Sequence, residues 1–225
     1  MLADEGAGRT VLFDLDGTLT DPFVGITSSI RYALEKLGRT APAAEDLRWC
    51  IGPPLKGAFL KLLDTSDEEL AEEGVRLYRE RYRAVGKFEN RVIDGIPGML
   101  AKLRDDGFPL FVATSKLAGY ANEILDHFGL EPYFLALYGS HADGTHADKE
   151  DLIRNLLAVE EIAPGRAVMI GDRSHDVIGA KANGVPAIGV LWGYGDRGEL
   201  AGAGAARIAE FPEEIRAMVR DLPIA

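Results

Sequence analysis

Short apolar runs recur along the chain, and most of them are followed by Gly, Asp, Ser or Thr. The runs cover residues 10–15, 109–114, 136–139, 167–170 and 187–191 and are rich in Val, Ile, Leu and Phe. Runs of this kind are typical of strands that are buried on both faces of a sheet. The pattern therefore predicts five strands of one covered sheet.

Amphipathic stretches lie between these runs and predict helices. Ile124, Leu125 and Phe128 form an apolar stripe that ends at Gly129, and a similar stripe lies within 152–157. Asn183 and Gly184 follow a third such stretch and suit a helix end. Strands that alternate with helices predict right-handed crossovers and an α/β fold with a doubly wound parallel sheet. In such a sheet the functional site is expected at the carboxyl ends of the strands.

The region from 20 to 93 differs, because it shows helical periodicity and no convincing strand. One apolar face is centred on Ile30 and Leu34, and a second is centred on Phe59. The string from Ser66 to Glu69 matches a capping box and predicts the start of a third helix. We therefore expect two domains, an α/β core formed by 1–19 and 94–225, and an inserted helical domain formed by 20–93.

Charge and cysteine content narrow the class of protein. The 25 basic and 36 acidic residues give a formal charge of −11, which argues against a nucleic-acid polymer as partner. A small phosphorylated metabolite is still allowed, because a local basic pocket and a metal can outweigh the overall charge. Cys50 is the only cysteine. The acidic start at Met1–Glu5 is unlike a signal peptide, and no apolar run suits a membrane span, so we expect a cytoplasmic protein.

Two carboxylates, Asp14 and Asp16, follow the first predicted strand and precede Gly17. Alternation along a strand points both side chains to the same side. Two close carboxylates repel each other, so the arrangement favours a bound cation or a protonated group. A lone Asp-x-Asp-Gly string is also common in ordinary turns.

The string from Asp14 to Thr18 resembles the first motif of the haloacid dehalogenase-like hydrolases. Phe111 to Lys116 resembles the second motif, Lys149 stands where the third places its lysine, and Ile170 to Asp176 resembles the fourth. The helical insert matches the C1 cap of that family, and the likeness is nearest to its phosphoglycolate phosphatase-like and 5′-nucleotidase-like members. Glu150 stands where many members have proline, which bears on the subfamily rather than on activity.

The resemblance implies a phosphatase, and the needs of phosphoryl transfer agree with it. Asp14 would attack phosphorus and form a covalent intermediate, while Asp16 would protonate the leaving oxygen. Mg²⁺, which prefers oxygen ligands, would bind the Asp14 carboxylate, the Asp16 backbone carbonyl and Asp172. Asp176 would reach the metal through water.

The resemblance also implies a phosphate site. Thr114 would donate its hydroxyl to a phosphate oxygen, with help from backbone N–H groups around Ser115, and Lys149 would balance the negative charge. Lys56 and Arg91 in the insert are candidate substrate contacts, although turn chemistry or surface charge explains them equally well. The favoured substrates are nucleoside 5′-monophosphates and phosphoglycolate.

Other interpretations remain open at this point. A sugar phosphomutase would use the same scaffold, and a non-catalytic binding protein would have the same fold. A signalling receiver domain also uses an aspartyl-phosphate, but it is much shorter and lacks a helical insert. The string from Gly193 to Gly198 satisfies the GxGxxG pattern, yet it lies too near the C-terminus for a dinucleotide-binding unit, so a flexible loop is expected. A monomer and a homodimer are both compatible with the sequence.

Overall fold

The structure is a computed structural model, and it describes residues 8–223. Within these residues the chain forms two compact units, one made of 8–20 and 92–223 and the other of 21–91. The sequence boundaries were expected at Thr20 and Asp94. Met1–Glu5, where the sequence argues against a signal peptide, lies outside the described residues.

A six-stranded parallel sheet forms the centre of the larger unit, with strand order β5-β4-β1-β6-β7-β8. Its strands are β1 (Thr10–Phe13), β4 (Leu110–Leu117), β5 (Ala136–Ser140), β6 (Ala167–Gly171), β7 (Ala187–Val190) and β8 (Arg207–Ala209). Five of them were expected from the apolar runs. The sequence did not predict β8, because this three-residue edge strand pairs only with β7 and begins at an exposed Arg207. An edge strand lacks the continuous apolar run that marks a strand covered on both faces.

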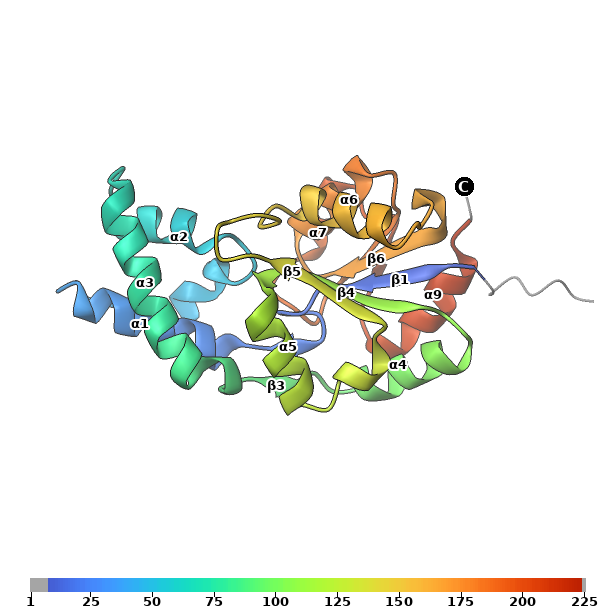
Figure 1. The fold of residues 1–225 in the computed structure, drawn as a ribbon, viewed down its shortest axis with the longest axis horizontal. Helices are drawn as coiled ribbons and strands as arrows, with labels where there is room; N and C mark the ends of the chain where they lie inside the picture. Colours follow the sequence, from blue (N-terminus) through green and yellow to red (C-terminus); the bar gives the residue numbers. More distant parts are fainter. Residues whose placement is uncertain (1–7, 224–225) are drawn as a thin grey trace, which may run out of the picture. The chain divides into compact units, whose positions relative to one another are not determined.

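Helices cover both faces of this sheet, which confirms the predicted doubly wound α/β class (Figure 1). The helices of the larger unit are α4 (Ile96–Asp105), α5 (Ala118–His127), α6 (Lys149–Val159), α7 (Ser174–Ala182), α8 (Arg197–Ala203) and α9 (Ile215–Asp221). Side chains of α4, α5 and α9 pack on one face of the sheet, whereas those of α6, α7 and α8 pack on the other. The strands alternate their side chains between these two layers.

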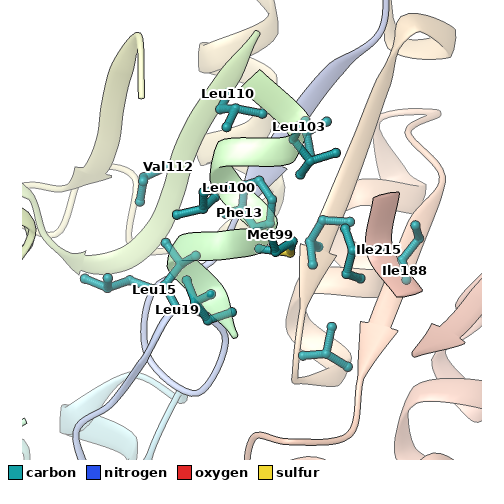
Figure 2. Packing of buried hydrophobic residues seen from close by; sticks show 14 of the residues in the cluster. Phe13, Leu15, Leu19, Met99, Leu100, Leu103, Leu110, Val112, Ile188 and Ile215 are labelled. Atoms are coloured by element: carbon teal, nitrogen blue, oxygen red, sulfur yellow. The ribbon is translucent and has the colours of Figure 1, made fainter. Parts of the chain in front are cut away.

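The layer under α4 and α9 shows how the first strand is fixed. Phe13 and Leu15 belong to the same buried apolar cluster as Leu100 and Leu103 of α4 and Ile215 of α9 (Figure 2). These side chains are fully buried. Complete burial of a large apolar side chain contributes about 1.5–3 kcal/mol. The packing therefore holds the chain rigidly on either side of Asp14.

The smaller unit is helical, as the periodicity predicts. Its helices are α1 (Phe23–Lys36), α2 (Leu55–Leu62) and α3 (Glu68–Ala84), with 3₁₀ turns η1 (Glu45–Cys50) and η2 (Gly86–Phe88). Phe59, Ile30 and Leu34 are buried in it, as their apolar spacing indicates. Cys50 is also buried, and burial raises the pKa of its thiol to about 12.

Two details of the insert differ from the sequence prediction. The side chain that caps α3 is Asp67 rather than Ser66, because its Oδ1 accepts hydrogen bonds from the backbone N–H groups of Glu69 and Leu70. The region also carries two short strands, β2 (Thr20–Asp21) and β3 (Arg91–Val92), which pair with each other where the chain enters and leaves it. A strand of two residues is too short to show the alternation of apolar and polar positions by which strands are predicted. Within residues 8–223, no helix has both the length and the apolar character that crossing a membrane requires.

Candidate active site

The carboxyl ends of three neighbouring strands bring the predicted residues together. Phe13 of β1 lies in register with Val112 of β4 on one side and with Ile170 of β6 on the other. Asp14 follows directly, and its N–H donates to the Ile170 carbonyl at 2.9 Å. Parallel strands in this register end at the same edge of the sheet. The segments after β1 and β6 and the end of β4 therefore meet there.

Lys149, the first residue of α6, lies at the centre of this edge. Its Nζ donates to Asp14 Oδ1 at 2.8 Å and to the Ala113 carbonyl at 2.8 Å, and it lies 2.7 Å from Asp176 Oδ1. Burial by itself lowers the pKa of Lys149, but the carboxylates of Asp14 and Asp176 outweigh burial and raise it. The ammonium group thus stays charged, and its three N–H groups are directed at these protein oxygens.

Asp14, Asp172 and Asp176 form a buried acidic cluster. Each offers one carboxylate oxygen, and these oxygens lie within 4.8 Å of one another. Burial and the neighbouring carboxylates raise the pKa of Asp172 well above its ordinary value, and burial raises the pKa of Asp176 as well. Closely grouped carboxylates suit a hard divalent cation, which favours the charged forms of Asp172 and Asp176. The donor set thus fits a metal such as Mg²⁺.

The loop after β7 holds Asp172 in place. The Tyr194 N–H donates to Asp172 Oδ2 at 2.7 Å, and Thr18 Oγ1 lies 3.4 Å from Asp172 Oδ1. A Cβ on Gly193 would lie 2.4 Å from Asp172 Oδ2, and one on Gly195 would lie 2.1 Å from the Asp172 carbonyl oxygen. Contacts below about 3 Å exclude a side chain, so these glycines allow a close backbone approach. Gly193 and Gly195, which belong to the string that satisfies the GxGxxG pattern, therefore allow the loop backbone to contact Asp172.

Asp16 pairs with Lys116, a residue to which the sequence motifs gave no role in the site. Lys116 Nζ lies 2.7 Å from Asp16 Oδ2, and the two side chains are 8% and 12% exposed. Burial raises the pKa of Asp16, and the charge of Lys116 partly offsets that rise. The only sequence signal for this residue was a lysine directly after the Thr114-Ser115 strand end.

Thr114 and Ser115 both lie within β4, near the strand's end. Thr114 is buried, and its Oγ1 accepts a hydrogen bond from the Lys116 N–H at 3.3 Å. The Ser115 carbonyl accepts from Ser140 Oγ of β5 at 2.8 Å, which ties the two strand ends together. A hydroxyl that accepts one hydrogen bond can still donate its own proton. The contacts of Thr114 thus leave its hydroxyl proton available to a ligand.

Lys56 and Arg91 belong to the smaller unit, and each pairs with acidic groups there. Lys56 Nζ lies 2.9 Å from Glu68 and 2.8 Å from Glu72. The Arg91 guanidinium lies 2.8 Å from Asp21 Oδ2, with most of its side chain exposed. Exposed pairs of this kind contribute little to stability, about 0–1 kcal/mol. Both residues remain candidate substrate contacts only.

Two carboxylates follow the first strand of this doubly wound sheet, and a lysine and an acidic pair lie beside them at the same edge. This arrangement is typical of an α/β enzyme of phosphoryl transfer. A family model described as haloacid dehalogenase-like hydrolase matches residues 11–190. The chain belongs to this family, as its motifs predict.

Individual relatives narrow the class further. A 5′-nucleotidase of Pseudomonas aeruginosa is 50% identical over 190 residues, which cover 84% of this chain and 86% of that protein. A tyrosine-protein kinase PtkA of Mycobacterium tuberculosis is 44% identical over 187 residues, covering 83% of this chain but 63% of that protein. A crystal structure of a predicted phosphatase from Clostridium acetobutylicum superposes with a TM-score of 0.92 at 44% identity, covering 96% and 99% of the two chains. Family and relatives together make this chain a phosphatase.

Proposed function

We propose that this phosphatase hydrolyses small phosphomonoesters, with nucleoside 5′-monophosphates as its leading substrates, through a phosphorylated Asp14. The contact between Asp14 and Lys149 carries the proposal. Lys149 binds Oδ1 of Asp14 and thereby fixes the carboxylate, while Oδ2 accepts no hydrogen bond from the residues that the structure describes. A carboxylate held through one oxygen presents its other oxygen as a nucleophile.

The raised pKa of Asp16 supports a role as general acid. Burial raises the pKa of Asp16 and so favours its protonated form, which can give a proton to the leaving oxygen. Once Asp14 is phosphorylated, the resulting Asp16 carboxylate can take a proton from the attacking water. Thr114 would bind a phosphate oxygen through its hydroxyl, next to the backbone at Ser115.

The metal site in this proposal consists of Asp14, Asp172 and the backbone carbonyl of Asp16, with Asp176 beside them. The close spacing of the three carboxylates supports it. A bound Mg²⁺ would supply positive charge that lets the nucleophile and the phosphate dianion approach each other. The protein's own contribution is to hold Asp172 through Tyr194 and the adjoining glycines.

The name of the Pseudomonas relative supports nucleoside 5′-monophosphates as substrates. Phosphoglycolate is the second choice, from the resemblance of the motifs to the phosphoglycolate phosphatase-like group. Both are monoesters of a primary alcohol, and such a poor leaving group needs the proton from Asp16.

A phosphate-release assay tests the proposal. The protein is assayed with Mg²⁺ on a panel of nucleoside 5′-monophosphates, phosphoglycolate and sugar phosphates, and kcat/KM is measured for each. We expect hydrolysis that a chelator abolishes, that Asp14→Asn abolishes, and that the control Asp126→Asn retains, because Asp126 is exposed on α5. Full activity in Asp14→Asn would refute the nucleophile.

The same preparation separates the other candidates. Transfer of phosphate to an added sugar phosphate in place of water would indicate a phosphomutase. Transfer from ATP to a tyrosine peptide would indicate the activity named for PtkA. Absence of turnover with every phosphoryl donor would indicate a non-catalytic binding protein.

A further inference from the structure

Lys116 is the last residue of the string that resembles the second motif, and it lies where β4 continues beyond Thr114 and Ser115. The strand runs through Thr114, Ser115 and Lys116 to Leu117, and its pairing with β5 shifts register between Thr114 and Leu117. Such a shift redirects side chains locally. Here it accompanies a lysine whose Nζ lies 2.7 Å from Asp16 Oδ2.

The pair is buried, so the lysine restricts the orientation of the carboxyl group. The side chains of Lys116 and Asp16 are 8% and 12% exposed. An exposed pair would exchange among many rotamers, whereas a buried one is held by its surroundings. The contact therefore fixes the direction of the Asp16 carboxyl plane.

The two oxygens of Asp16 differ in their surroundings. Oδ2 faces the Lys116 ammonium group, whereas Oδ1 is buried without a hydrogen-bond partner among the described residues. A buried polar atom left without a partner is costly and calls for an explanation. A proton on this carboxyl group would reside on Oδ1, because an oxygen that faces an ammonium group acts as an acceptor.

We propose that Lys116 is a positioning residue that holds Asp16 through Oδ2 and so directs the protonated Oδ1 at the leaving oxygen. The inference rests on the proposed function, in which Asp16 is the general acid. As an Asp14 oxygen bonds to phosphorus, the ester P–O bond breaks. The leaving oxygen keeps that electron pair and takes the proton of Oδ1, and Lys116 then faces a full carboxylate.

In the second step the proton is transferred in the opposite direction, to Asp16. A water oxygen bonds to phosphorus, one of its protons passes to Oδ1, and the bond between phosphorus and Asp14 breaks with its electron pair returning to Asp14. Lys116 again leaves Oδ1 free to accept. The same contact thus serves both steps without taking part in either.

The dependence of kcat/KM on the leaving group distinguishes a positioning role of Lys116 from a role in charge balance alone. A nucleoside 5′-monophosphate releases an alkoxide that must be protonated, whereas 2,4-dinitrophenyl phosphate releases a stable anion that needs no acid. We expect Lys116→Met to lower kcat/KM about 10- to 100-fold on the nucleotide but less than about 3-fold on the aryl ester, as loss of general acid catalysis requires. Lys102→Met, which removes an exposed lysine of α4, should change neither value.

A double-mutant cycle adds an independent criterion. If Lys116 acts through Asp16, Asp16→Asn with Lys116→Met should lose no more nucleotide activity than Asp16→Asn alone. Equal losses on both substrates in Lys116→Met, or additive losses in the double variant, would overturn the inference. If Lys116→Met does not fold, Lys116→Gln makes the same comparison. A wild-type protein inactive on both esters, or an active Asp14→Asn, would refute the proposed function instead.

Discussion

Replacing Lys149 with Met removes the ammonium group that lies between Asp14 and Asp176, 2.8 Å from one carboxylate and 2.7 Å from the other. Met has a similar length, so the change is mainly one of charge. Removing one partner of a buried ion pair costs about 3–5 kcal/mol. The variant should therefore be strongly destabilised when no metal is present.

Proton uptake by the acidic cluster sets an upper limit to the loss of unfolding free energy in Lys149→Met. One added proton restores the net charge of the cluster, and at about pH 7 protonating an ordinary Asp costs about 4 kcal/mol. At about pH 5 the same proton costs between about 1 and 2 kcal/mol. We expect Lys149→Met to lose about 3–4 kcal/mol of unfolding free energy at neutral pH and less than about half of that at the lower pH. Added Mg²⁺ should restore part of the loss, because it supplies the missing positive charge.

Urea unfolding can report on the larger unit alone, which matters because a protein of two units need not unfold in one step. The chain has two tryptophans, and Trp192 packs against the core of the larger unit while Trp49 belongs to the smaller. In a Trp49→Phe background, fluorescence follows Trp192. A loss of unfolding free energy below about 1 kcal/mol at both pH values, or a greater loss at the lower pH, would show that Lys149 does not stabilise the buried carboxylates in this way. Lys102→Met is the control.

Three further predictions concern the metal site and the smaller unit. Gly193→Ala should weaken Mg²⁺ binding about 10-fold by calorimetry, because its Cβ would lie 2.4 Å from Asp172 Oδ2, whereas Gly202→Ala meets no atom within 4 Å and should bind normally. Because the pKa of Asp172 is raised, its protonated form stabilises the metal-free fold at low pH, and this stabilisation is lost as the pH rises. The increase in Tm caused by Mg²⁺ should therefore grow with pH, and an increase that stays constant would contradict this. Asp67→Ala should cost about 1 kcal/mol in urea unfolding followed by Trp49, and Ser66→Ala should cost less; the reverse order would contradict the observed cap.

The sequence was sufficient to predict five of the six strands and the candidate residues at their ends, because covered strands are continuous apolar runs and several candidates lie at or directly after the end of one. Asp14, Thr114 and Asp172 share this pattern, so a parallel register brings their segments together without further information. Lys149 was predicted from its place in the third motif, and it is the first residue of α6.

Contacts that depend on backbone geometry were not readable from the sequence. The contact of Lys116 with Asp16 accompanies a β4 strand that continues through polar residues to Leu117, and no apolar pattern signals that continuation. Gly193 and Gly195 were interpreted as a loop because glycine spacing does not reveal which backbone approaches which side chain. The choice of Asp67 over Ser66 as helix cap is a shift of one residue, which is within the usual uncertainty of a helix boundary.

Isolation of the phosphorylated enzyme would show whether Asp14 is the nucleophile. The protein is mixed with a nucleoside 5′-monophosphate and Mg²⁺, quenched in acid within the first turnover, and its peptides are analysed by mass spectrometry. We expect the mass of one phosphoryl group on the peptide that contains Asp14, and none in Asp14→Asn. A phosphoryl group on another residue, or full turnover without a modified Asp14, would contradict this expectation.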